Sequence, residues 1–239
     1  MWMNMVKIKA IAAPGVHDRV LALLQEELEG GRILDVGAGQ GALSDRLKCL
    51  GFDVRACDIN IQQFRCRDIV CDRIDLNEPL PYDDETFDAV TCIEVIEHLM
   101  NPYNLLKEIG RVVKRDGFLI LSTPNIIGLH RRIRFLIHGE FGRYFPKEGF
   151  SGAGYHIYPL HPYQIEYFLH QAGFTVTETT TNMFVKKVNT YGILPFLLSL
   201  LELPFYIIAK PKDKVLLRGD ILIFKCRASS KQFLENPHV

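Results

Sequence analysis

The chain has 239 residues and a mass of 27.3 kDa, a length at which one large α/β domain can bury a full core. Its 28 basic and 28 acidic residues balance, so no overall field draws it onto a polyanion, and we expect no nucleic-acid partner. The six cysteines form no close C-x-x-C pair, which disfavours zinc and dithiol redox sites, and we expect a cytoplasmic protein with reduced thiols.

Short β-rich runs alternate with helical patterns along the chain, which indicates a mostly parallel sheet covered on both faces. The patterns predict helices at 16–28, 42–50, about 101–114 and 162–171, and strands at 32–36, 52–57, 69–76, 87–92, 118–122, 174–181 and 215–227. The last of these strands is expected to return antiparallel. The predicted fold is a doubly wound, Rossmann-like α/β sheet of seven strands, in a single domain covering 1–239.

A long glycine-containing segment from about 125 to 160 follows the fifth predicted strand, and it predicts a substrate cap. Inside it, Arg131, Arg132 and Arg134 form a short basic amphipathic stretch. Such a stretch suits an anionic substrate or lipid headgroups, and it is also typical of a solvated helix face.

An apolar insertion at about 190–210 contains a nearly unbroken apolar run over 191–209. Pro195, Glu202 and Pro204 interrupt this run and disfavour a membrane span. We interpret it as two short apolar elements that pack on the sheet, lie at a membrane surface or dock on another chain.

A glycine turn, DVGAGQG at 35–41, links the first predicted strand to the next helix. Glycines let the backbone approach a ligand closely, and the helix N-terminus offers free N–H groups. Asp58 follows the second strand about twenty residues further on, where an acid accepts the ribose hydroxyls of an adenosine. The spacing also fits an NAD(P)-dependent oxidoreductase, but Asp35 places a charge where those folds usually carry an apolar residue.

These blocks resemble the class I S-adenosylmethionine (SAM)-dependent methyltransferases. ILDVGAGQG is similar to their first motif, CDIN to their ribose-binding acid, and IDLNEPLPYDDETFDAVTCIEVIEHL to their adenine and fourth-strand region. The match continues through RVVKRDGFLILSTPN and covers about 30–175. Within the superfamily, the block at 91–125 most resembles ubiquinone-biosynthesis O-methyltransferases and related bacterial enzymes of small-molecule and surface-glycan pathways.

The resemblance implies a SAM-binding core over about 30–125. It places the glycine turn on the methionine part of SAM, Asp58 on the ribose, and Asp75 with Leu76 beside the adenine; a turn-capping role for Asp75 is the alternative. The full set of implied cofactor-binding residues is Asp35, Gly37, Gly39, Gly41, Asp58, Asp75, Leu76 and Cys92.

The methyl group of SAM is already activated, so transfer needs mainly a nucleophile held about 3 Å away. A hydroxyl nucleophile gains from a base or a metal. Glu94, Glu97 and His98 stand at i, i+3 and i+4, so a helical turn would place them on one face, and His156 on the cap could meet them. Such a ligand set suits Mg²⁺ or Mn²⁺, and in this motif alone it resembles the metal site of small-RNA 2′-O-methyltransferases.

Two other interpretations of these residues stay open. His98 or His156 can act as a metal-free base, and the two glutamates can simply favour the positive end of the next helix. His161 directly precedes Pro162 and is predicted to begin a helix instead.

The predicted function is SAM-dependent O-methylation of a hydroxylated small molecule or of a lipid- or glycan-linked acceptor, in the cytoplasm or at the membrane surface. The alternatives are a non-catalytic docking protein with this fold and, less favoured, the NAD(P)-dependent oxidoreductase.

Overall fold

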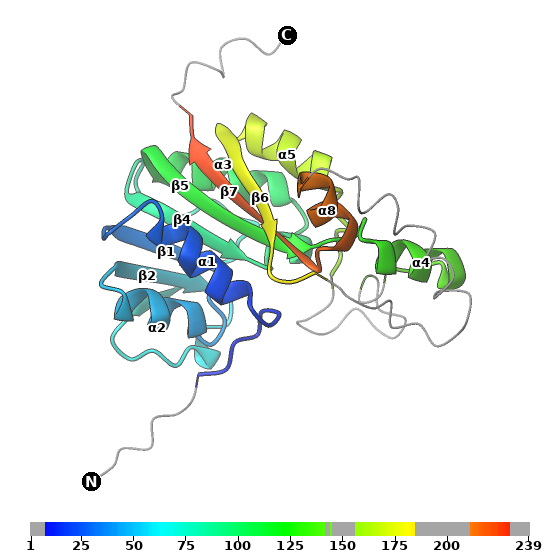
Figure 1. The fold of residues 1–239 in the computed structure, drawn as a ribbon. Helices are drawn as coiled ribbons and strands as arrows, with labels where there is room; N and C mark the ends of the chain where they lie inside the picture. Colours follow the sequence, from blue (N-terminus) through cyan, green and yellow to red (C-terminus); the bar gives the residue numbers. More distant parts are fainter. Residues whose placement is uncertain (1–7, 142–143, 145–155, 185–210, 230–239) are drawn as a thin grey trace.

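The computed structural model describes residues 8–141, 144, 156–184 and 211–229. A seven-stranded sheet with the order β3-β2-β1-β4-β5-β7-β6 forms its centre (Figure 1). β7 runs antiparallel to both β5 and β6, and the other neighbours are parallel. The strands are β1 Arg32–Val36, β2 Asp53–Asp58, β3 Val70–Arg73, β4 Phe87–Ile93, β5 Val113–Pro124, β6 Phe174–Thr181 and β7 Ile221–Ala228. The predicted sheet, mostly parallel with an antiparallel last strand, is confirmed.

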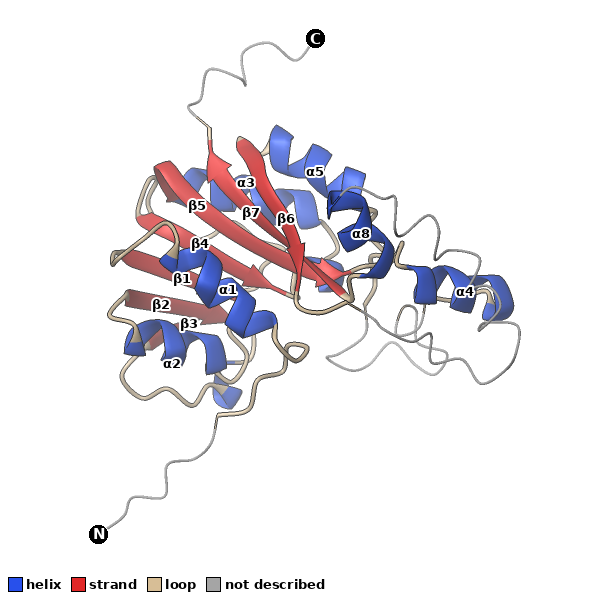
Figure 2. Ribbon diagram, viewed as in Figure 1, coloured by secondary structure: helices blue, strands red, loops and turns tan. Residues whose placement is uncertain are grey.

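Helices cover the two faces of this sheet, as Figure 2 shows: α1 (Val16–Gln25) and α2 (Ala42–Cys49) on one face, α3 (Pro102–Val112) and α5 (Pro162–Gln171) on the other. Successive strand residues point to opposite faces. In β1, Ile33 therefore packs in the core beside α1 and α2, and Leu34 in the core beside α3 and α5; neither is exposed. A strand buried on both sides reads as a continuous apolar run, which is why the sequence indicates a parallel sheet.

Local capping signals define the ends of two helices. Asn101 caps α3 by accepting a hydrogen bond from the Asn104 amide (3.2 Å), and Pro102 follows at the first helical position. His161 caps α5 in the same way: its Nδ1 accepts from the Tyr163 amide (3.3 Å). The prediction that His161 begins a helix is confirmed.

The structure adds one helix to the predicted elements and changes the start of one predicted strand. The cap contains a regular helix, α4 (Leu129–His138), which buries Leu129 and Ile133 and ends at Gly139. The predicted strand at 215–227 is wrong over its first residues, because Pro211–Arg218 forms helix α8 and β7 starts only at Ile221. The reason is tertiary: the Asn125 side chain, at the end of β5, donates to the carbonyls of Leu216 (2.8 Å) and Gly219 (2.9 Å) and so caps α8.

The position of β7 bears on the oxidoreductase alternative. Dinucleotide-binding folds build a second parallel half, with the order 3-2-1-4-5-6. Here an antiparallel strand lies between β5 and β6, so that second half is missing from the sheet.

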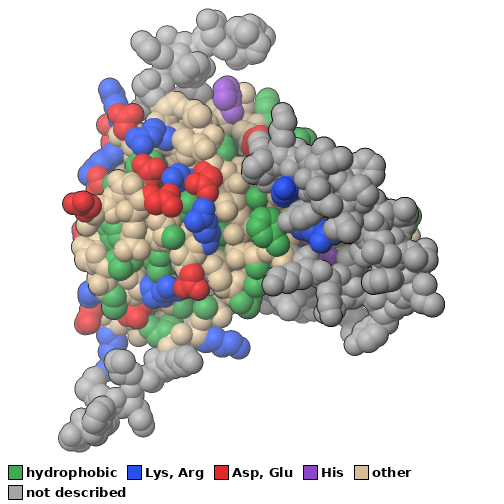
Figure 3. Space-filling view, viewed as in Figure 1, with side chains coloured by type: hydrophobic (Ala, Val, Ile, Leu, Met, Phe, Trp, Pro, Cys, Tyr) green, Lys and Arg blue, Asp and Glu red, His purple; other side chains and the backbone are tan. Residues whose placement is uncertain are grey.

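Basic and acidic side chains are interspersed on the face in Figure 3, in line with the balanced composition. Among the described residues, no helix is both long and apolar enough to cross a bilayer. The run at 191–209 lies outside the described residues.

Candidate functional site

The glycine turn lies between the carboxyl end of β1 and the start of α2. Gly37, Gly39 and Gly41 all have positive φ (70°, 56° and 87°), a region that side chains with a Cβ rarely adopt. The amide of Gly37 donates to the Cys57 carbonyl (2.8 Å), which ties the turn to β2. A Cβ on Gly37 would overlap Cγ2 of Val95, so the backbone here is also closely packed.

Asp58 lies at the carboxyl end of β2, directly beside the turn. One carboxylate oxygen accepts from the amide of Gly39 (2.9 Å), and the other from the amide of Asn60 (2.8 Å). The side chain is buried except for a small part of its surface. Each oxygen can accept a further hydrogen bond, so Asp58 can still receive ribose hydroxyls.

Asp35 is a buried acid beneath the turn. Its carboxylate accepts from the hydroxyls of Ser44 (2.5 Å) and Thr91 (2.9 Å) and so joins β1 to α2 and β4. Burial raises its pKa to about 6, although the two hydroxyls act in the opposite direction. With both oxygens engaged inside the protein, Asp35 shapes the turn from below.

Three further residues predicted to bind the cofactor follow β3 or lie near the end of β4. Asp75 is exposed, and its carboxylate accepts from the amide (3.0 Å) and the side chain (2.9 Å) of Asn77, which lowers its pKa. It therefore caps a turn, as the alternative interpretation expects. Leu76 and Cys92 are buried in the core. Their contact with SAM stays a prediction.

Glu97, His98 and His156 come together at the carboxyl edge of the sheet. One ligand atom from each lies within 4.8 Å of the others. The rings of His98 and His156 meet edge to face, with centroids 5.0 Å apart. The amides of Ile157 and Tyr158 both donate to the carbonyl of Glu97 (2.9 and 3.0 Å), so the cap is fastened to this point by its backbone.

Glu97 has the most unusual environment of the three. It is fully buried, and Thr123 at the end of β5 donates to its Oε2 (3.1 Å). Its Oε1 is buried and has no hydrogen-bond partner among the described residues. Burial raises the pKa of this carboxyl to about 8. A buried oxygen without a partner is costly, and such groups occur where a ligand completes them.

Glu94 is not among the three residues whose ligand atoms come together, although its charge acts on Glu97 and adds to the rise in the pKa of that carboxyl. The expected helical turn does not form: Glu94 has φ +54°, and only Ile96–His98 makes a single 3₁₀ turn. The Glu94 carboxylate instead accepts from the amide of Ala13 (3.0 Å) in the segment before α1. The prediction that all three motif residues share one helical face is wrong, because the left-handed Glu94 turns its side chain toward the N-terminal segment.

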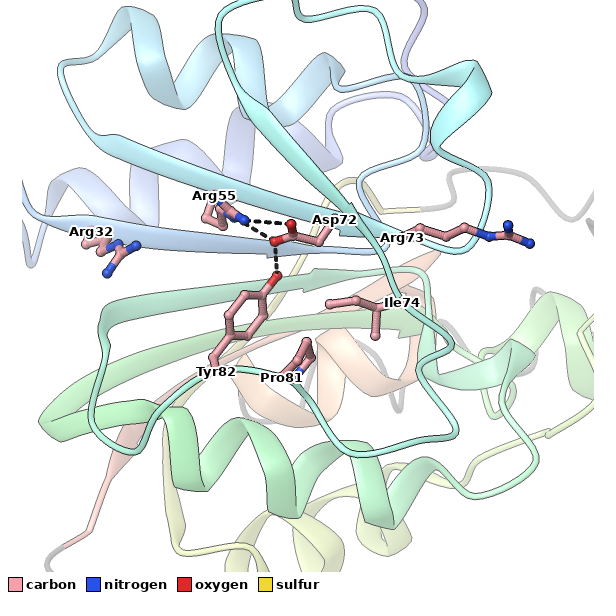
Figure 4. A pocket seen from close by; sticks show the side chains of 7 residues that line it. All are labelled: Arg32, Arg55, Asp72, Arg73, Ile74, Pro81 and Tyr82. Carbon is pink, nitrogen blue, oxygen red and sulfur yellow. Dashed lines mark hydrogen bonds and ion pairs between the residues drawn. The ribbon is translucent and has the colours of Figure 1, made fainter.

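A cavity of about 480 Å³ is lined by residues of β2, β3 and the loop that follows β3 (Figure 4). Arg55 forms a two-pronged ion pair with Asp72 (2.6 Å for both bonds), and Tyr82 donates to the same carboxylate (2.8 Å). Burial opposes ionisation of Asp72, but these hydrogen bonds hold its pKa below the usual range. No predicted cofactor residue lines this cavity.

Sequence reasoning did not include Thr123, the partner of Glu97. A signal existed, because Thr123 ends a strand at the same edge as the glycine turn. The hydrogen bond from the Ala13 amide to Glu94 was not predicted either, because no local sequence pattern indicates which carboxylate accepts from that amide.

A glycine turn with a neighbouring acid, at the carboxyl edge of a sheet whose β7 is antiparallel, defines a class I SAM-dependent methyltransferase. Residues 9–179 match the family described as a methyltransferase domain, and the chain belongs to this family.

Named relatives and solved structures agree with this assignment. The chain is similar to the ubiquinone biosynthesis O-methyltransferase of Glaesserella parasuis, at 30% identity over 175 residues that cover 56% of this chain and 72% of the relative. The enzyme of the same name from Acinetobacter baumannii is 26% identical over 187 residues, which cover 70% and 73% of the two chains. A SAM-dependent methyltransferase from Archaeoglobus fulgidus shares the fold, with a TM-score of 0.59, 19% identity and coverage of 88% and 94%.

Proposed function

We propose that this methyltransferase transfers the methyl group of SAM to a hydroxyl oxygen, with Glu97, His98 and His156 around the reacting hydroxyl. One observation carries the proposal: a fully buried carboxyl group, whose Oε1 has no hydrogen-bond partner among the described residues, lies beside two imidazoles at the sheet edge that also bears the glycine turn. Relatives named as O-methyltransferases support an oxygen acceptor.

SAM supplies an activated methyl group, so the chain must hold the acceptor oxygen in line and remove its proton. His98 or His156 can accept that proton, because a neutral imidazole has one acceptor nitrogen. Thr123 orients Glu97 through Oε2. The Oε1 atom has no hydrogen-bond partner among the described residues, so it can accept a hydrogen bond from the methyl acceptor or bind a cation.

A divalent cation fits the same three residues. The Oε1 atom of Glu97, which has no hydrogen-bond partner in the part of the chain that the structure describes, would provide one oxygen ligand, and the two histidines would provide nitrogen ligands. Because imidazole favours transition metals over Mg²⁺, two histidines with one carboxylate suit Mn²⁺ better than Mg²⁺. When bound, the cation would supply Lewis acidity that lowers the pKa of a coordinated hydroxyl. Glu94, the fourth predicted ligand, is engaged at Ala13 in this structure.

The test is methyl transfer from radiolabelled SAM to a panel of catechols, phenols and sugar diols, with Mn²⁺, with Mg²⁺ and with a chelator. We expect turnover of at least one hydroxyl compound, and a loss of about 100-fold or more in Glu97→Gln and His156→Ala. His170→Asn, an exposed histidine on α5, is the matched control and should retain full activity. Activity that survives chelation identifies a histidine base, and activity that needs Mn²⁺ identifies a metal. Equal activity in wild type and Glu97→Gln would refute the assigned centre.

We further propose that the acceptor is lipid-linked or lies at a membrane surface. The support is helix α4, which extends away from the sheet (Figure 1). Its apolar stripe begins with buried Leu129 and Ile133 and continues into Leu136 and Ile137, which are 75% and 45% exposed. Three arginines lie on the same helix, the composition of a helix that rests on anionic headgroups.

Flotation with vesicles tests this second proposal. We expect the protein to float with phosphatidylglycerol vesicles but not with phosphatidylcholine vesicles, and Leu136→Asp to abolish flotation. Val70→Asp, on the edge strand β3 and 57% exposed in wild type, is the control for adding a surface charge. Flotation that is equal for both variants, or absent for wild type, would exclude α4 as a membrane contact.

A further inference from the structure

We infer that Glu94 is a positioning residue that fastens the segment 9–15 over the glycine turn, so that this segment forms part of the wall of the SAM pocket. The inference rests on SAM binding at that turn, and it assigns to Glu94 a role distinct from metal ligation. It is built on three groups of contacts.

The first group joins the segment to the turn itself. The amide of Lys9 donates to the side chain of Gln40 (3.2 Å). The Ile11 side chain lies against Gly39, with its Cδ1 only 3.1 Å from where a Cβ would stand. Ile11 is nevertheless 67% exposed. A large apolar side chain on a glycine turn, but outside the core, is suited to cover a bound ligand.

The second group anchors the segment at its far end. The side chain of Asn182, just after β6, donates to the carbonyl of Pro14 (2.9 Å), and its oxygen accepts from the amide of Ile221 in β7 (3.0 Å). This anchor fixes where the segment enters α1. It does not hold the stretch at 9–13 that runs to the turn, so a further attachment is needed between the anchor and the turn.

The third group provides that attachment. The carboxylate of Glu94 accepts from the amide of Ala13. Glu94 itself is held in its left-handed conformation because its amide donates to both the carbonyl and the hydroxyl of Ser122 (3.1 Å each). A non-glycine residue keeps such a conformation only where its surroundings impose it, and these positions cluster at functional sites. The next residue, Val95, packs on Gly37, so one short stretch contacts both the turn and the segment that covers it.

Two variants separate this role from metal ligation. In Glu94→Gln the side-chain oxygen can still accept from the Ala13 amide, but the charge that a metal ligand needs is gone. In Glu94→Ala both are lost. Glu85→Ala is the matched control, because Glu85 is also a glutamate at positive φ (53°) and lies at the opposite end of β4, where it pairs with Arg115 (3.1 Å).

The experiment measures S-adenosylhomocysteine and SAM affinity by calorimetry, and amide hydrogen exchange of Ala13 in the protein without cofactor. For Glu94→Ala we expect affinity to fall about tenfold, the equivalent of one hydrogen bond, and exchange of Ala13 to accelerate. Glu94→Gln should stay within about twofold of wild type in both measurements, as should Glu85→Ala. A Glu94→Ala protein with unchanged affinity and exchange would overturn the inference, and so would a Glu94→Gln protein as impaired as Glu94→Ala.

The two readouts also separate this inference from the proposed function. If wild type bound no SAM, the methyltransferase function would fail, whereas the exchange of Ala13 would still report whether Glu94 holds the segment. If SAM bound normally but Ala13 exchanged equally in all variants, only the role of Glu94 would fail.

Discussion

Gly37→Ala should destabilise the fold through two separable effects. The residue has φ +70°, and an L-residue in the left-handed region costs about 1–2 kcal/mol. The new Cβ also overlaps Cγ2 of Val95, and overpacking of a close-packed site costs about 1–3 kcal/mol. Alanine restricts the unfolded chain, which offsets about 0.5–1 kcal/mol. We therefore expect a net loss of about 1–4.5 kcal/mol in the free energy of unfolding.

Urea denaturation followed by circular dichroism measures this loss, with two comparisons. Gly139→Ala is the control for backbone strain, because Gly139 has nearly the same φ (+69°) and nothing within 4 Å of the new Cβ. It should cost only about 1 kcal/mol. In a Val95→Ala background the overlap disappears, so Gly37→Ala should lower the free energy of unfolding about as little as Gly139→Ala does in wild type. If Gly37→Ala costs no more than Gly139→Ala, or costs the same in both backgrounds, the steric argument is wrong.

Three further predictions concern residues outside the reacting centre. The folded chain holds the proton of Asp35 more tightly than the unfolded chain (pKa about 6 against 3.8), so this group lowers the free energy of unfolding by on the order of 3 kcal/mol as pH rises from about 4 to 6. Asp35→Asn should flatten this pH dependence, measured by urea denaturation, and an unchanged slope against pH would contradict the prediction. Lys225 is buried against Glu26 (3.1 Å) and Glu27 (2.9 Å). Lys225→Ala should lower the free energy of unfolding by about 1–3 kcal/mol in thermal unfolding, a loss kept small because the two acids are partly exposed, and Lys225→Met should lower it less. Equal losses in the two variants would show that packing alone matters. Arg111 donates to the carbonyls of Leu80 (2.8 Å) and Tyr82 (2.7 Å) as well as to Glu108. Arg111→Lys should therefore lower the free energy of unfolding by about 1–2 kcal/mol and speed amide exchange over 80–84. Unchanged exchange would argue against a role of Arg111 in holding that loop.

The sequence by itself determined the fold class and the cofactor edge. Apolar runs such as 32–36 and 118–122 alternate with helical patterns, and this periodicity depends only on which faces must be buried. Gly37 and its neighbours mark a turn that side chains would block, and Asp58 follows at a fixed distance along the chain. His161 with Pro162 is a capping signal within three residues. Each of these signals is local, so it is readable without the tertiary structure.

Only the tertiary structure decided which acids share a site. Glu94 and Glu97 are three residues apart in one motif, but a left-handed backbone at Glu94 sends its carboxylate to Ala13, while Glu97 is buried with Thr123 and faces the histidines. That backbone conformation is imposed by Ser122 on a neighbouring strand. In the same way, the Asn125 side chain caps the end of helix α8 at residues that the sequence pattern predicts as the start of a strand. Contacts between residues distant in sequence set these outcomes, and no short-range pattern encodes them.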